Sequence, residues 1–168
     1  MSNIILVGYM GCGKSTVGKR LSYRVKMPYV DTDKLIEAGQ QMEISEIFAQ
    51  KGEPAFRDME TECVKGLFEN KQDYVISVGG GLPLREENRE LLKKLGKVVY
   101  LRAKPETIYE RLKEDTTRPL LRGESPQEKI CFMMEERGPV YEMAADFVID
   151  VDGKGFDEIM DEIEEALV

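Results

Sequence analysis

The segment from Gly8 to Ser15, Gly-Tyr-Met-Gly-Cys-Gly-Lys-Ser, constrains the fold of this chain more than any other segment. It fits the phosphate-binding pattern G-x-x-x-x-G-K-[ST] and directly follows the apolar run 4–7. The pattern has a physical meaning only between a buried strand and a helix. Its glycines let several backbone N–H groups point at one anion, and the positive end of the helix adds to the attraction. A chance match on a glycine turn is the alternative, expected on the order of once in a hundred chains.

The loop therefore predicts a site for the phosphates of a nucleoside triphosphate. The Lys14 ammonium would reach the β- and γ-phosphates, and the Ser15 hydroxyl would bind Mg²⁺. The residues expected to contact ATP are Gly11, Cys12, Gly13, Lys14, Ser15 and Thr16.

The rest of the chain reads as one α/β domain with a parallel sheet. A length of 168 residues suits a single domain, 1–168, with its own core. Short apolar runs alternate with amphipathic stretches, which is the pattern of strands covered by helices on both faces. The predicted strands are 4–7, 29–31, 74–78, 98–101 and 147–149. The predicted helices are 14–25, 32–38, 44–50, 54–69, 85–95, 105–112, 126–136 and 156–167.

Composition excludes several function classes. There are 32 acidic against 24 basic residues, a formal net charge of −8, so we expect neither nucleic acid nor an anionic membrane as a partner. No apolar run is long enough for a membrane span, and the early first strand leaves no room for a signal peptide. Three scattered cysteines without a C-x-x-C pair indicate reduced thiols and a cytoplasmic location. The absence of histidine excludes a serine–histidine triad and a histidine-ligated metal.

Asp31 and Asp33 close the second predicted strand. Both residues stand at the carboxyl end of the strand, which is the sheet edge where α/β proteins bind ligands. One carboxylate could face the Mg²⁺–phosphate site and the other a second substrate, and Asp31 is the candidate that would hold Mg²⁺ through water. The alternative is that either residue caps the following helix.

Three successive glycines, Gly79 to Gly81, follow the third predicted strand. Such a run is costly to order, so it indicates either close approach of the backbone to a ligand or simply a wide turn. Arg57 and Arg137 are the other candidates, although an isolated arginine is most often solvated or ion-paired.

Two segments interrupt the alternation of strands and helices. One is the helical stretch 32–69, and the other is the polar stretch 113–125, which carries Arg118. Both would overhang the ligand-binding edge of the sheet. A surface excursion is the alternative for each.

These features together resemble the shikimate kinase family. The matching motifs are Gly-x-x-Gly-x-Gly-Lys-Ser, Asp31-x-Asp33, Phe56-Arg57, Gly79-Gly80-Gly81, Arg118-Pro119-Leu120-Leu121 and Arg137-x-Pro139-x-Tyr141. They occur in this order over nearly the whole chain. The phosphate loop alone is shared by many kinases, whereas the combined set is specific.

The resemblance implies an ATP-dependent kinase that transfers the γ-phosphoryl group to the 3-hydroxyl of shikimate, a step of aromatic amino-acid biosynthesis. It also implies a monomer with a three-layer fold and a parallel sheet in the order 2-3-1-4-5. Residues 32–69 would bind shikimate, and residues 113–125 would form a mobile lid.

The resemblance also assigns residues to roles. The catalytic residues would be Lys14, Asp33 and Arg118, and Arg118 would contact ATP from the lid. Shikimate would contact Asp33, Arg57, Gly80 and Arg137, with Gly79 and Gly81 on either side of Gly80. Two arginines suit a carboxylate because each guanidinium fork can bond both oxygens.

The chain departs from the family pattern in two places. The segment before the last helix, 150–155, has no arginine to pack near adenine, and Lys154 is the only basic candidate there. Cys12 stands where a smaller residue is common, which raises the question of thiol sensitivity.

Two rival functions remain open on the sequence. A kinase of the same fold could act on gluconate or a nucleotide, and a P-loop module could bind nucleotide without catalysis. A nucleotide acceptor would need a base pocket and more basic residues in the insert. A non-catalytic module would not need Lys14, Asp33 and Arg118 together.

Overall fold

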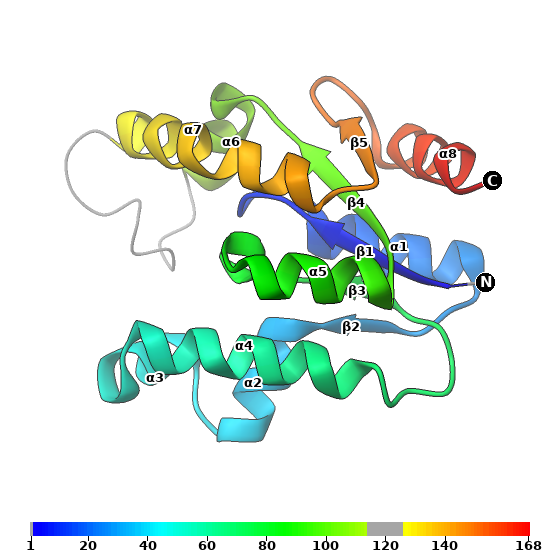
Figure 1. Cartoon of the computed structure of the whole chain (residues 1–168). Coiled ribbons are helices and arrows are strands. Elements are labelled where there is room, and N and C mark those ends of the chain that lie inside the picture. The colour runs from blue at the N-terminus through cyan, green and yellow to red at the C-terminus, as the bar shows by residue number, and fades with distance from the viewer. Residues whose placement is uncertain (1, 114–125) are drawn as a thin grey trace.

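A parallel sheet of five strands organises the chain, and its order is the expected β2-β3-β1-β4-β5 (Figure 1). The structure is a computed structural model that describes residues 2–113 and 126–168. The strands are β1 (Asn3–Val7), β2 (Tyr29–Asp31), β3 (Val75–Ser77), β4 (Gly96–Arg102) and β5 (Phe147–Asp150). Every neighbouring pair is parallel.

Helices cover both faces of this sheet. The helix α1 (Lys14–Val25) packs on α8 (Phe156–Leu167) at one face, and α5 (Glu86–Leu95) packs on α7 (Pro126–Ala144) at the other. A further helix, α6 (Pro105–Leu112), lies against α7. Because both faces are covered, the central strand is apolar throughout its buried part, and residues 4–7 of β1 are at most 5% exposed.

The helices between β2 and β3 form a body of their own beside the β2 edge (Figure 1). They are α2 (Thr32–Gln40), α3 (Ile44–Lys51) and α4 (Glu53–Leu67). Ile36, Ile47 and Phe56, one from each helix, make a buried apolar cluster separate from the main core. The predicted helical insert is thus present as three packed helices.

The predicted helix 126–136 is wrong at its end, because α7 continues to Ala144 through Gly138 and Pro139. A proline inside a helix lacks the N–H that would bond to the carbonyl four residues earlier. The last turns of α7 nevertheless persist, since they bury Tyr141 and Ala144 where the helix packs on the sheet. Tertiary packing outweighs the local cost of the proline.

One short element was not predicted. The 3₁₀ helix η1 (Leu82–Leu84) follows the three glycines and leads into α5. Within residues 2–113 and 126–168, no helix has both the length and the apolarity needed to cross a bilayer.

The topology brings three segments to one edge of the sheet. In the register, Leu6 of β1 pairs with Ser77 of β3, which in turn pairs with Asp31 of β2. The three strands therefore end level with one another. The glycine-rich loop after β1, the aspartates after β2 and the three glycines after β3 emerge side by side.

Candidate active site

The phosphate loop has the backbone that an anion site requires. Gly8, Gly11 and Gly13 have φ values of 151°, 82° and 98°, which side-chain-bearing residues rarely adopt. Gly13 is the N-cap of α1, and among the described residues no side chain caps this helix end. Its free N–H groups therefore remain available to a phosphate.

Lys14 is folded back over its own loop. Its Nζ donates to the backbone carbonyl oxygens of Gly8 and Tyr9, the latter at 3.3 Å. Ser15 and Thr16, in the first turn of α1, are exposed. The lysine charge is thus held against the first two residues of the loop.

Cys12 is packed under this loop and is only 1% exposed. A Cβ atom built on Gly8 would lie 2.8 Å from Cys12 Sγ. The thiol therefore fills space that glycine leaves beneath the loop, as a small apolar side chain would.

The two aspartates after β2 take different positions. Asp31 caps α2, because its Oδ1 accepts hydrogen bonds from the N–H groups of Asp33 (2.9 Å) and Lys34 (3.3 Å). Asp33 instead points to the glycine run, and a Cβ atom built on Gly79 would lie 2.6 Å from Asp33 Oδ1. Buried Thr32, between them, accepts a hydrogen bond from Gly79 N–H at 3.1 Å.

Each of the three glycines abuts a different polar side chain. Gly79 faces Asp33, whereas the place of a Gly81 Cβ atom is taken by the Arg57 guanidinium. A Cβ atom built on Gly80 would lie 3.5 Å from an Arg137 guanidinium nitrogen. The same Cβ position is 3.8 Å from the Gly8 carbonyl oxygen of the phosphate loop. The glycine run is therefore a bare stretch of backbone between the phosphate loop and the side chains predicted to bind substrate.

Arg57 is held by a buried carboxylate. Its Nη1 lies 2.7 Å from Glu60 Oε1, and the side chains of Arg57 and Glu60 are 14% and 1% exposed. Burial raises the pKa of Glu60 to about 7, with a further rise from Asp33, although the neighbouring Arg57 guanidinium opposes it. Glu60 Oε2 has no hydrogen-bond partner among the described residues and lies 3.2 Å from the place of a Gly79 Cβ.

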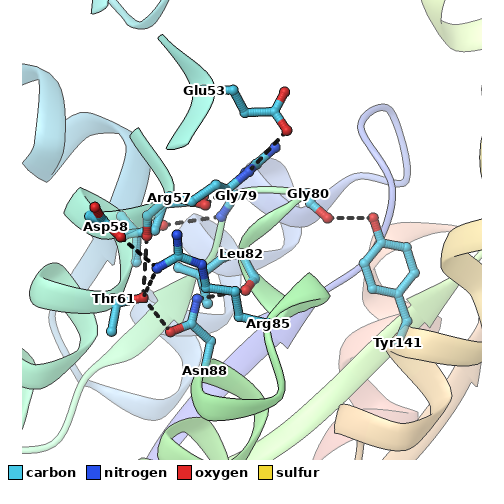
Figure 2. Close-up of polar contacts among 12 residues, drawn as sticks. Glu53, Arg57, Asp58, Thr61, Gly79, Gly80, Leu82, Arg85, Asn88 and Tyr141 are labelled. Carbon is cyan, nitrogen blue, oxygen red and sulfur yellow. Dashed lines mark hydrogen bonds and ion pairs between the residues drawn. The ribbon is translucent and has the colours of Figure 1, made fainter. Parts of the chain in front are cut away.

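Arg137 reaches the site from the opposite side, on α7. Its guanidinium lies 5.9 Å from the centre of the Tyr9 ring in the phosphate loop. One turn further along α7, the buried Tyr141 hydroxyl donates to the Gly80 carbonyl oxygen at 2.6 Å (Figure 2). Arg57 on α4 and Arg137 on α7 thus face one glycine run from two sides.

The sequence motifs that carry this arrangement belong to one known group of proteins. The family model described as shikimate kinase matches residues 10–168. The chain belongs to the shikimate kinase family.

Relatives in the shikimate kinase family cover the chain almost completely. It is 47% identical over 163 residues to the shikimate kinase of Thermodesulfovibrio yellowstonii, covering 97% of this chain and 93% of the relative. The solved structure of shikimate kinase from Acinetobacter baumannii in complex with shikimate superposes with a TM-score of 0.92 at 35% identity. That match covers 99% of this chain and 93% of the other. The expected α/β P-loop kinase fold and the ATP-dependent kinase activity are confirmed.

Likeness to a solved gluconokinase extends only to the fold. A gluconokinase from Sinorhizobium meliloti superposes with a TM-score of 0.58 at 16% identity, covering 99% of this chain and 91% of that one. A gluconate acceptor is therefore not supported, since membership of the shikimate kinase family rests on far higher identity.

The structure brings Asp33, Arg57 and Arg137 together at the glycine run beside the phosphate loop, and it adds other side chains. Arg118 and most of the predicted lid 113–125 lie outside the described residues. Lys154, the candidate near adenine, is paired with Glu162 at 2.8 Å. Arg111 was not expected in the site, yet its Nη1 donates to the Gly11 carbonyl oxygen at 3.2 Å and lies 3.1 Å from the place of a Gly13 Cβ.

Glu60 and Tyr141 were also missed as site residues. The three-residue spacing of Arg57 and Glu60 in a helix could have indicated an ion pair, because such residues share a helix face. Nothing in the spacing says that the pair is buried. Tyr141 stood inside a quoted motif, but its bond to Gly80 joins residues 61 positions apart, which only the fold reveals.

Proposed function

We propose that this shikimate kinase family member transfers the γ-phosphoryl group of ATP to the 3-hydroxyl of shikimate, and that the residues around the glycine run bind the acid. The observation that carries the proposal is the convergence of Arg57 and Arg137 on Gly79–Gly81, next to the phosphate loop. Two guanidinium groups form a basic pocket in a chain whose net charge is −8. Such a pocket is what a small anionic substrate needs.

The acid would be held by charge and shape together. Arg57 and Arg137 would bond the carboxylate, and the bare backbone at Gly79, Gly80 and Gly81 would let the ring lie close to it. Asp33 would accept hydrogen bonds from ring hydroxyls and orient the one that attacks. Its carboxylate is suited to this role because it faces the glycine run at Gly79.

The nucleotide would occupy the adjacent loop. Backbone N–H groups of Gly11, Cys12 and Gly13 would cradle the phosphates, with Lys14 neutralising charge on the transferred group. Thr16 would add a hydroxyl from the first turn of α1. Arg118 would contact ATP when the 113–125 lid closes and excludes water.

Ser15 and Asp31 fit a magnesium ion that keeps part of its water shell. The exposed Ser15 hydroxyl can be a direct ligand, whereas Asp31, with Oδ1 in the helix cap, would act through water. Tyr29 lies close enough to Ser15 and Asp31 for both to affect its pKa. Burial raises that pKa, the Ser77 and Ser15 hydroxyls lower it, and the Asp31 charge raises it further. Its buried hydroxyl has no hydrogen-bond partner among the described residues. When bound, the ion would neutralise charge developing on the phosphates.

The proposed location, oligomeric state and partners rest on the family and on composition. Residues 32–69 would serve as the shikimate-binding insert, and the enzyme would act as a cytoplasmic monomer on two small molecules. Nucleic acid and membranes are not proposed partners, because the acidic surface repels both.

A coupled assay of ADP release with Mg-ATP tests the proposal. Shikimate, gluconate and AMP are compared as acceptors, and Lys14→Ala protein controls for contaminating ATPases. Shikimate alone should give acceptor-dependent ADP, and phosphorus–proton coupling in the product should place the phosphate on the 3-oxygen. Turnover with another acceptor but not with shikimate would refute the assignment.

A further inference from the structure

Two buried side chains anchor the glycine run between the two arginines, one at its middle residue and one at the residue that follows it. Tyr141 of α7 donates to the Gly80 carbonyl oxygen at 2.6 Å, and Asn88 of α5 donates to the Leu82 carbonyl oxygen at 2.9 Å. Figure 2 shows the Tyr141 bond to Gly80 and the Asn88 bond to Leu82. Neither side chain is one of the charged groups expected to hold the substrate.

The Tyr141 anchor connects the glycine run to Arg137. The two residues are four apart on α7, so they share one face of that helix. Tyr141 is 1% exposed, and its ring centre lies 5.2 Å from that of Tyr100. Burial raises the pKa of the Tyr141 hydroxyl, which therefore keeps its proton and stays a donor. The bond fixes the backbone at Gly80 relative to the helix that carries Arg137.

The Asn88 anchor connects the same backbone to Arg57 through Thr61. Asn88 is fully buried, and its Oδ1 accepts a hydrogen bond from Thr61 Oγ1 at 2.8 Å. Thr61 lies four residues after Arg57 on α4, hence on the same face of the helix. Leu82, Asn88 and Thr61 thus form an unbroken chain of bonds from the end of the glycine run to α4.

Arg85 extends this series of hydrogen bonds from Thr61 to Asp58. Its Nη1 lies 3.3 Å from Thr61 Oγ1 and 2.9 Å from Asp58 Oδ1 (Figure 2). The bonds therefore join α4, η1 and α5 into one rigid support. Polar groups that are all paired in this way specify one geometry, since any shift leaves a buried group unsatisfied.

We propose that Tyr141 and Asn88 are positioning residues that set the spacing between Arg57 and Arg137 by holding the glycine run from both sides. The inference rests on the proposed function, since it concerns how the shikimate carboxylate is gripped. Two forks can bond one small carboxylate only when their separation is held to within a fraction of an ångström. A small acid cannot impose that separation on two side chains from different helices, so the protein must set the spacing.

The test uses Tyr141→Phe and Asn88→Ala in the full chain, with kcat, both KM values, shikimate affinity by calorimetry and Tm. Each variant should raise the KM and Kd for shikimate about fivefold, the effect of one lost hydrogen bond, while kcat and the KM for ATP stay within about twofold. If Asn88→Ala does not fold, Thr61→Val takes its place, because it removes the hydroxyl that orients the Asn88 amide. Thr61→Ser should then restore the wild-type KM.

Two matched controls separate positioning from stability. Tyr100→Phe removes a hydroxyl from the neighbouring buried ring. Asn3→Ala removes an amide that donates to Leu95 O at 2.9 Å near the start of β1, away from the glycine run. Both should lower Tm without changing the KM for shikimate.

An unchanged shikimate KM in either test variant, with Tm lowered as in the controls, would overturn the inference. Wild-type turnover of shikimate is measured first. The absence of turnover would count against the proposed function. Normal wild-type turnover, together with an unchanged shikimate KM in the variants, would count against the positioning role alone.

Discussion

The Arg57 guanidinium occupies the space where a Cβ atom on Gly81 would lie. The backbone of Gly81 itself is ordinary, with φ −95° and ψ −7°, so any L-residue could adopt it. Glycine is therefore required at this position by the arginine rather than by the turn. Close packing of a side chain is thus a reason for glycine at this position that was not predicted from the sequence.

Gly81→Ala should displace Arg57 and raise the KM for shikimate roughly tenfold, an effect of the size of a disturbed charged hydrogen bond. The KM for ATP should not change. Gly138→Ala is the control, because a Cβ atom there would meet nothing within 4 Å. Equal shikimate KM values in the two variants would mean that the Arg57 position is not important for binding.

Lys14→Ala should reduce turnover by more than about 10³-fold, because its charge is held over the loop where the transferred phosphate would lie. Circular dichroism should show an intact fold. Lys19→Ala, at an exposed position on the same helix, is the control and should retain full activity. Near-normal rates for the Lys14 variant would remove the lysine from phosphate binding.

Arg57→Ala should weaken shikimate binding by about 2–4 kcal/mol, since the charge is largely desolvated and its loss leaves Glu60 without a partner. Calorimetry with shikimate gives the change directly. Arg24→Ala, in an ion-pair cluster with acidic residues of α8, serves as the control. Wild-type affinity in the Arg57 variant would place the carboxylate elsewhere.

Asp33→Asn should lower kcat by roughly 10²-fold or more while Tm stays near the wild-type value. The fold should persist because Asp31, not Asp33, caps α2. Asp31→Ala should by contrast cost about 1 kcal/mol of stability through loss of that cap. A kcat unaffected by the Asp33 substitution would leave this carboxylate without a part in the reaction.

Glu60 should make stability depend on pH near neutrality. Its pKa in the folded state is about 7, above the ordinary 4.5, so the folded state holds this proton more tightly. The stabilisation is fully present below pH 4.5 and is lost as pH rises through about 7. It amounts to at most about 3 kcal/mol.

Urea unfolding of wild-type and Glu60→Gln protein at pH 5 and pH 8 checks this. The variant has no titrating group at this position. From pH 5 to pH 8 the free energy of unfolding of the wild type should therefore fall relative to that of the variant. Glu62→Gln, at an exposed position on the same helix, should run parallel to the wild type. Parallel curves for the Glu60 variant as well would show that the carboxyl titrates normally.

The sequence was sufficient for the five strands and for most of the helices. Apolar runs located all five strands, because β1, β3 and β4 are largely buried and the edge strands β2 and β5 still carry apolar or aromatic residues. The phosphate loop was predicted from its spacing together with the apolar run before it, and the positive φ values of Gly8, Gly11 and Gly13 agree with that prediction. Local rules of this kind can be read from neighbouring residues.

What the sequence did not reveal depends on residues distant in the chain. The helix through Pro139 is stabilised by the burial of Tyr141 and Ala144, which no local rule anticipates. Asp31 and Asp33 were equally good candidates for the helix cap until the structure assigned it to Asp31. Glu60 looks like any exposed glutamate in a helix, and only packing against Gly79 and Arg57 makes it a buried acid.

The separate apolar cluster of Ile36, Ile47 and Phe56 has a consequence for how such enzymes diversify. Helices α2 to α4 carry Arg57 and Asp33, and this cluster packs them on one another, while Val64 and Leu67 tie α4 to the main core. Substitutions that reshape acceptor recognition can therefore accumulate there while the nucleotide half, built on β1 and α1, keeps its structure. A common ancestor could in this way give rise to kinases for unrelated small metabolites.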